Sequence, residues 1–268
     1  MAERAFNIRR QTGFTTIAMA CFAMLYMPII LLVVYSFNAG TSIAIWEGFS
    51  WRWYASAWEN EQVQEATVRS LIIALWASVI STTCAVLAAL ATTRTRKFKG
   101  QTAVFAMINQ PLMVPEIVTA VALLIFFAMI KVATGYTGLA YLIIAHSAFC
   151  IPFAYLPIRA RLQGMDLSLE QAAADLYATP FQVFRRITLP QLWPGILAGA
   201  MLAFVISLDD VVITEFVKSA GQDTLPTYML GQLRRVVTPE INAISTVLLG
   251  ISVTMVIAFT LLSKFRNQ

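Results

Sequence analysis

Four ionisable residues lie inside long apolar stretches of this 268-residue chain: Glu116, His146, Asp209 and Asp210. Ionisable side chains within a membrane span are costly, and they usually face a pathway or a partner. Carboxylates accept hydrogen bonds from ammonium groups and attract positive charge. The three acids therefore indicate a passage for a small cationic solute.

The carboxylates are expected at a similar depth in the membrane. Glu116 lies sixteen residues beyond Gly100, and Asp209 lies sixteen residues beyond Trp193, each counted from the cytoplasmic edge of a predicted span. At 1.5 Å per residue, both acids lie roughly 24 Å along their helices. Pro111 and Pro115 remove backbone hydrogen bonds just before Glu116, and the freed carbonyls could also coordinate an ammonium group.

A second interpretation of the acids stays open. They could cap broken helices, or they could pair with basic residues, namely Arg69, Lys131 or Lys218. His146, the one histidine, is placed with the pathway residues, although a lone histidine in a span is commonly a polar packing residue bonded to a neighbouring helix. No metal site is expected, because His146 has no nearby co-ligands.

The composition places these residues in a membrane protein. Hydrophobic residues make up 59% of the chain and charged residues only 12%, about half the share of a soluble domain. A spanning helix needs about 20 mostly apolar residues. Continuous apolar runs favour helices over barrel strands, which alternate. We expect an all-α protein with six spans, at roughly 14–37, 66–91, 103–130, 139–158, 192–217 and 241–263.

The distribution of Lys and Arg predicts the orientation. With the N-terminus in the cytoplasm, thirteen of the 19 basic residues fall on cytoplasmic segments: Arg4, Arg9, Arg10, Arg94, Arg96, Lys97, Lys99, Arg159, Arg161, Arg185, Arg186, Lys264 and Arg266. Both termini are therefore expected to be cytoplasmic. This bias accounts for the net charge of +5, so no nucleic-acid partner is expected.

The segment 162–190 is the one long, charged, helix-prone cytoplasmic stretch. Ser168 is expected to cap a first short helix that contains Glu170 and three alanines. Thr179 is expected to cap a second one with Pro180 at its first position, and Pro190 to end it. Two short helices joined by a bend are typical of a docking element. A plain amphipathic connector is the alternative.

This segment closely resembles the loop by which membrane subunits of binding-protein-dependent ABC importers contact their ATPase. The family pattern is Glu-Ala-Ala, three residues, Gly, nine residues, Ile, one residue and Leu-Pro. The matching positions here are Ala172, Ala173, Ile187, Leu189 and Pro190, with Asp175-Leu176 helping to fix the register. Gln171 occupies the Glu position, with Glu170 one residue earlier, and Tyr177 occupies the Gly position.

The resemblance covers almost the whole chain and is most specific to the second permease of spermidine/putrescine importers. The segments that carry it are Tyr35-Ser-Phe-Asn38, Trp46-Glu-Gly-Phe-Ser-Trp-Arg-Trp-Tyr54, His146 with Phe149-Cys150, Ser207-Leu-Asp-Asp-Val-Val212 and Pro239-Glu-Ile-Asn-Ala243. It implies a type I ABC importer permease fold in a bacterial inner membrane, as a single membrane domain over 1–268 with a core of about 66–263.

The resemblance also implies the partners: a homologous permease, membrane lipid, a dimer of ATPase subunits, and a periplasmic binding protein that delivers a small cationic solute. The chain has no Gly-x-x-x-x-Gly-Lys-Ser/Thr phosphate loop. We therefore expect no enzyme activity and no cofactor on this chain, with ATP and Mg on the partner ATPase. The departures at Gln171 and Tyr177 favour a heterodimer of permeases.

Other functions remain as alternatives. The solute could be an amino acid or a related amine. A secondary transporter driven by an ion gradient would use the carboxylates as proton or sodium sites, but matching interrupted helices in inverted halves are not visible. A membrane scaffold without transport would leave the acids unexplained.

Overall fold

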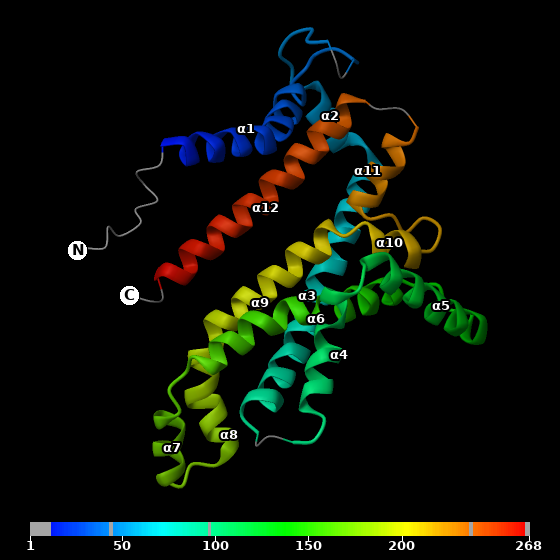
Figure 1. The fold of residues 1–268 in the computed structure, drawn as a ribbon. Helices are drawn as coiled ribbons and strands as arrows, with labels where there is room; N and C mark the ends of the chain where they lie inside the picture. The colour runs from blue at the N-terminus through cyan, green and yellow to red at the C-terminus, as the bar shows by residue number, and fades with distance from the viewer. Residues whose placement is uncertain (1–11, 43–44, 96–97, 236–237, 266–268) are drawn as a thin grey trace. The chain divides into compact units, whose positions relative to one another are not determined.

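The computed structural model describes residues 12–42, 45–95, 98–235 and 238–265 (Figure 1). These residues are nearly all helical, with an isolated β-bridge between Asn38 and Phe49, so the predicted all-α class is confirmed. Several basic residues used to predict the orientation lie outside the described residues: Arg4, Arg9, Arg10, Arg96, Lys97 and Arg266.

The helices follow one another along the chain, with the longest connection, 36–51, between α1 and α2. Their bounds are α1 Thr12–Tyr35, α2 Arg52–Glu59, α3 Glu61–Thr93, α4 Gln101–Met113, α5 Glu116–Thr134, α6 Ala140–Gln163, α7 Ser168–Asp175, α8 Pro180–Val183, the π-helical turn η2 Phe184–Thr188, α9 Leu189–Asp209, α10 Val212–Val217, α11 Leu225–Leu233 and α12 Pro239–Phe265.

Six helical stretches of the described chain are long and apolar enough to cross a membrane, as predicted. They are Gly13–Tyr35, Glu61–Thr93, Glu116–Thr134, Ala140–Gln163, Pro180–Asp209 and Pro239–Ala258. The third and the fifth differ from the predicted ranges.

The predicted third span, 103–130, is wrong as one helix. The structure divides it into α4 and α5, with Val114 in an extended conformation (φ −98°, ψ 138°) and Pro115 as the residue before α5. Proline has no N–H to donate and disfavours the helical conformation in the residue before it. Glu116 therefore lies in the first turn of α5, and its expected depth along a continuous helix does not hold.

The predicted fifth span, 192–217, is also wrong in its bounds. Helical structure is continuous from Pro180 to Asp209, then stops at the extended residue Asp210 before α10 begins. Pro190 does not end the short helix. In η2 the Leu189 N–H donates to the carbonyl of Phe184, and this wider turn accommodates a proline at the start of α9.

The chain forms two compact units, and each is described by itself. The prediction of a single membrane domain over 1–268 is not tested by this division and stays a prediction. The first unit holds α1, α2 and, from residues 232–251, the N-terminal part of α12. In it the buried Asn38 side chain donates to the carbonyls of Ser42 and Ile45, and the Trp53 indole donates to the Asn38 carbonyl, so Asn38 links these described residues to α2.

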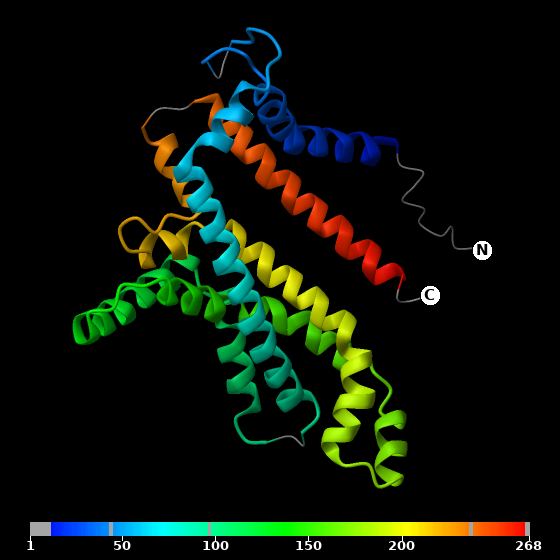
Figure 2. The same cartoon turned by 180° about the vertical axis from the view of Figure 1, so that it is seen from behind.

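The second unit, residues 62–231 with 252–268, is built around α6 and α9, which lie side by side in both views (Figures 1 and 2). Gly199 permits the close approach, because a Cβ there would lie 2.7 Å from the Ala154 carbonyl oxygen. Helix α10 packs on α5 and α6, and α4 packs on α6. Helices α7 and α8 lie at one end of the α6–α9 pair. This pair therefore carries Asp209 near one end and, at the other, the segment 162–190, called the docking segment below.

Candidate solute pathway and docking loop

Glu116, Asp209 and Asp210 line one open cavity of about 400 Å³ in the second unit. The rest of its lining is Phe149, Val205, Ile206, Val211 and Val212. The three acids predicted from the sequence are thus brought together, at two breaks in the helices rather than at one depth along unbroken ones. Acidic groups on an otherwise apolar wall suit a ligand that combines ammonium groups with a hydrocarbon chain.

Asp210 connects α9 to α10. Its Oδ1 accepts hydrogen bonds from the backbone N–H of Thr214 at 3.0 Å and from the Thr214 hydroxyl at 3.1 Å. The side chain is only 2% exposed, and Oδ2 has no hydrogen-bond partner among the described residues. Asp210, one residue before the N-cap Val211, thus satisfies a backbone N–H in the first turn of α10, close to the capping role of the alternative interpretation. Its Oδ2 is buried, and the neighbouring Glu116 carboxyl group lines the cavity.

His146 lies beside the cavity and is not among the residues that line it. Its imidazole is buried, with Nδ1 2.8 Å from the Ser207 hydroxyl and Nε2 2.9 Å from the Thr214 hydroxyl. Nε2 also lies 3.5 Å from Oδ1 of Asp210. The ring therefore joins α6 to α9 and α10, a geometry that fits the packing interpretation; contact of His146 with solute stays a prediction.

Two of the basic residues expected as alternative partners of the acids, Lys218 and Arg69, are engaged elsewhere. Lys218 Nζ lies 2.6 Å from carboxylate oxygens of both Glu215 and Asp223. Partial burial favours a lower pKa for Lys218, but the hydrogen bonds that Lys218 donates to Asp223 and Glu215 outweigh it and raise the pKa. Within the described parts of the chain, no Lys or Arg forms an ion pair with the three cavity acids.

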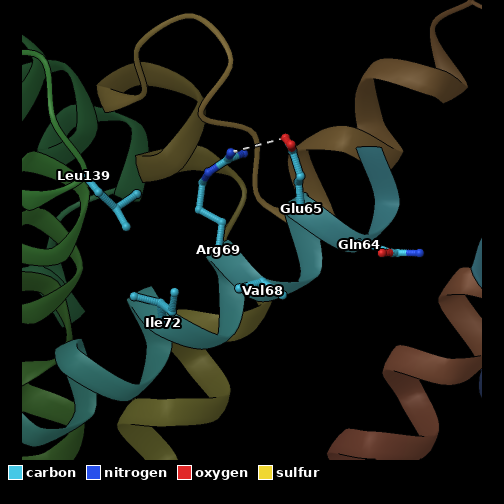
Figure 3. A pocket seen from close by; sticks show the side chains of 6 residues that line it. All are labelled: Gln64, Glu65, Val68, Arg69, Ile72 and Leu139. Atoms are coloured by element: carbon cyan, nitrogen blue, oxygen red, sulfur yellow. Dashed lines mark ion pairs between the residues drawn. The ribbon is translucent and has the colours of Figure 1, made fainter. Parts of the chain in front are cut away.

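Arg69 belongs to a second open cavity of about 490 Å³ (Figure 3). Its guanidinium lies 3.8 Å from the Glu65 carboxylate and donates to the Asp223 carbonyl at 2.7 Å. Figure 3 shows Arg69 and Glu65 facing each other across this ion pair, with the apolar side chains of Val68, Ile72 and Leu139 also lining the cavity. The positive charge of Arg69 is thus compensated by Glu65 and not by Glu116, Asp209 or Asp210.

The docking segment contains the two short helices that were predicted, with one cap assigned wrongly. Ser168 does not cap α7, because the N-cap position is Leu167. Asp166 binds the helix start instead, accepting from the Ser168 N–H at 2.9 Å and from its hydroxyl at 2.7 Å. The backbone bond from Ser168 lowers the pKa of Asp166. Thr179 does cap α8, with Pro180 at the first helical position, as predicted. Thr179 and Gln182 form a capping box.

Tyr177 supplies the bend between α7 and α8. Its φ of 60° is the left-handed conformation that favours glycine, which is the residue of the family pattern at this position. The side chain is 95% exposed, and the backbone N–H groups of Tyr177 and Ala178 close the end of α7 on the carbonyls of Ala174 and Ala173. The bend is therefore kept without the glycine.

The residues of segment 162–190 that match the family pattern differ in exposure to solvent. Those exposed are Gln171, Ala172, Asp175, Tyr177 and Pro190, while Ala173, Ile187 and Leu189 are half-buried. Leu176 and Phe181, which the family pattern leaves unspecified, add exposed apolar side chains. Their outward position depends on the bend at Tyr177, which a helical periodicity does not reveal. Glu170 points inward, toward Arg94 and Thr188.

Comparisons with known proteins cover most of the chain and agree on one family of membrane proteins. Residues 81–267 match the family model of the binding-protein-dependent transport system inner membrane component. The chain is 38% identical over 251 residues to the putrescine transport system permease protein PotI of Escherichia coli K12, covering 92% of this chain and 89% of that protein. It is 37% identical over 247 residues to the spermidine/putrescine transport system permease protein PotC of Haemophilus influenzae, covering 92% and 95%.

Solved structures share the fold. A bacterial ABC transporter involved in the import of the acidic polysaccharide alginate matches with a TM-score of 0.76 at 17% identity, covering 96% of this chain and 95% of that one. The MetNI methionine ABC transporter matches with a TM-score of 0.63 at 17% identity, covering 78% and 100%. The predicted importer permease fold is thereby confirmed. This chain, a multi-pass membrane protein by its six apolar helices, belongs to the family of binding-protein-dependent transport system inner membrane components.

Proposed function

We propose that this chain forms part of the transmembrane pore of an ATP-driven importer that moves a small cationic solute, a polyamine, from the periplasm to the cytoplasm. The observation that carries the proposal is the cavity lined by Glu116, Asp209 and Asp210, whose charge no described Lys or Arg neutralises. The names of the relatives, which include putrescine and spermidine permeases, support the choice of solute.

The geometry suits a polyamine in both of its chemical parts. Protonated amines donate hydrogen bonds to carboxylates, and such charge-assisted bonds are roughly twice as strong as neutral ones. The alkyl segments between the amines can lie on Phe149, Val205 and Ile206. Because Oδ1 of Asp210 already accepts two hydrogen bonds from Thr214, the carboxylate binds the solute less strongly than a free one would. A weak site is appropriate for a pore, since tight binding there would prevent release.

The proposed assembly contains this chain, a different homologous permease, two ATPase subunits that hold ATP and Mg²⁺, and a periplasmic binding protein. It lies in a bacterial inner membrane with both termini of the chain in the cytoplasm. Segment 162–190 contacts the ATPase through its exposed residues, including Gln171, Ala172, Leu176, Tyr177 and Phe181. Closure of the binding protein and ATP binding then turn the pore from inward-open to outward-open.

The proposal is tested by reconstituting the full assembly with its binding protein and measuring ATPase activity and uptake. The panel contains spermidine, putrescine, amino acids and anionic solutes, for wild type and for Asp209→Asn/Asp210→Asn. We expect polyamines to stimulate ATPase activity in wild type, and the double variant to lose their uptake. Glu65→Gln, which removes an acid outside this cavity, serves as the matched control.

Other outcomes would select another function. Stimulation by a neutral or anionic solute, with the double variant unaffected, retains the importer and excludes the polyamine. Uptake that needs an ion gradient and no ATP would instead support a secondary transporter. Purification with a single permease species would contradict the heterodimer.

A further inference from the structure

Glu170 lies in α7, the first helix of the docking segment, yet its carboxylate points away from the exposed face of that helix. Oε1 accepts a hydrogen bond from the Thr188 hydroxyl at 2.9 Å and lies 3.3 Å from Nη2 of Arg94. Oε2 lies 3.3 Å from Nε of Arg94. The side chains of Arg94 and Glu170 are only 19% and 17% exposed. The ion pair thus has two close N···O contacts, of which Nη2–Oε1 is a hydrogen bond, and it is largely shielded from water.

This one carboxylate joins three parts of the second unit. Glu170 belongs to α7, Arg94 immediately follows α3, and Thr188 ends the π-helical turn that leads into α9. Thr188 is itself buried. Any displacement of α7 is therefore applied to the ends of two predicted spans, rather than to the flexible middle of a loop.

The end of α3 is firmly attached to its surroundings, so it can receive such a displacement. The Thr92 hydroxyl lies 2.9 Å from the Tyr155 hydroxyl of α6, and the Gln101 side chain of α4 donates to the Thr92 carbonyl at 2.7 Å. The Arg159 guanidinium lies over the Phe105 ring at 4.4 Å. The cytoplasmic ends of α3, α4 and α6 consequently behave as one packed group.

The position of the acid in the sequence explains its direction. The family pattern places glutamate where this chain has the exposed Gln171. One residue corresponds to a rotation of about 100° around a helix, since a turn has 3.6 residues. Moving the acid from 171 to 170 therefore carries it from the exposed face of α7 to the face that meets Arg94.

We infer that Glu170 is a positioning residue that transmits movement of the docking segment to α3 and α9 through its ion pair with Arg94. The inference rests on the proposed function as an ATP-driven importer and specifies how this chain receives the force. A pair this shielded is disrupted by the loss of either partner, because the remaining charge is left without compensation. Restoring opposite charges in exchanged positions should then restore transmission.

The test uses the reconstituted assembly with Glu170→Gln, Arg94→Gln and the exchange variant Arg94→Glu/Glu170→Arg. Lys99→Gln is the matched control, since it removes a positive charge from the same turn. The readout is the ATP-dependent change in thiol labelling of Val211→Cys at the cavity, in a background where Cys21, Cys84 and Cys150 are serine. This readout needs no solute. Uptake per ATP hydrolysed is measured in parallel with whichever solute stimulates wild type.

We expect both single variants to co-purify with the ATPase subunits, yet to reduce the ATP-dependent labelling change about five- to tenfold, within the usual range of coupling energies. The exchange variant should recover to within about twofold of wild type, and Lys99→Gln should match wild type. Unchanged labelling in the single variants would overturn the inference. So would loss of co-purification without rescue by the exchange, which indicates a role in folding only. Failure of every polyamine to stimulate wild-type ATPase would reject the proposed solute and leave the labelling result valid.

Discussion

Thr214 donates two hydrogen bonds to one oxygen of Asp210, from its backbone N–H at 3.0 Å and from its hydroxyl at 3.1 Å. The pair holds the chain where α9 has ended and α10 begins. Because Oδ1 is used in this way, Asp210 combines a structural task with a charge at the cavity. Asp209, the neighbouring residue, is exposed, and its side chain forms no hydrogen bond to a helix start among the described residues. The two acids are therefore separable by substitution.

Substitution of either acid by asparagine should weaken solute uptake without unfolding the protein. Loss of one hydrogen bond to a charged group corresponds to about 1.5–3 kcal/mol, so we expect KM for a diamine to rise at least tenfold. Asp210→Asn keeps an oxygen that can accept from Thr214. Asp210→Ala also removes both hydrogen bonds with Thr214, so it should lower the free energy of unfolding by about 1 kcal/mol more than Asp210→Asn does. Uptake kinetics and thermal unfolding in detergent measure the two effects, and equal stability of the Asn and Ala variants would contradict the capping role.

Removal of the imidazole of His146 should destabilise the second unit. Hydrogen bonds between helices in membranes contribute on average about 0.6 kcal/mol each and at most about 1.7 kcal/mol. His146 bonds to both Ser207 and Thr214, so His146→Ala should cost about 1–3 kcal/mol, including the cavity left behind. Ser207→Ala, which removes one of the two bonds, should cost less. Thermal unfolding of both variants checks this order, and the reverse order would refute it.

Replacement of Tyr177 by glycine should stabilise the bend of the docking segment. A left-handed conformation costs an L-residue about 1–2 kcal/mol, and glycine avoids this cost. We expect Tyr177→Gly to gain roughly 1 kcal/mol and the β-branched Tyr177→Val to lose stability at the same φ of 60°. Limited proteolysis of the segment between α7 and α8 reports the difference. Equal cleavage of the two variants would show that the bend is not strained.

The ion pairs of Lys218 should make stability fall at alkaline pH. Its pKa in the folded protein is raised above the ordinary value of 10.5, because the bonds to Asp223 and Glu215 outweigh the effect of burial. The contribution is therefore complete below pH 10.5 and is lost as pH rises through the higher folded pKa. Thermal unfolding of wild type and Lys218→Met should differ most near neutral pH and converge above this range. A difference that grows with alkalinity would contradict the assignment.

Local chemistry made part of the structure predictable. The Thr179 cap follows from residues that are adjacent in the chain, and the six spans follow from apolar runs of sufficient length. The break before Glu116 was visible only as two prolines, since a hydropathy pattern averages over about 20 residues and does not place a break within them. The end of α9 at Asp209 is not marked by a proline, and the two adjacent acids indicated it only through the alternative interpretation, in which they cap broken helices.

The direction of a side chain was harder to predict than its position. His146 obtains its partners from residues 61 and 68 positions later, and Glu170 obtains Arg94 from 76 positions earlier. A resemblance to a family pattern places such residues on the correct helix. It does not reveal which face they occupy when the acid is moved by one residue, as Glu170 is relative to Gln171.

The two interrupted helices around the acid-lined cavity also determine how wet the site is. At each interruption the backbone becomes extended, at Val114 and at Asp210, although the Val114 N–H still donates to the Gln110 carbonyl. Backbone groups that lose such a partner in a membrane require protein or water instead. A hollow of about 400 Å³ is roughly tenfold larger than the ~30 Å³ of one water molecule. On the proposed pathway, a cavity of this size leaves room for part of the hydration shell of a protonated amine beside Glu116, Asp209 and Asp210, so complete dehydration of the solute is not required there.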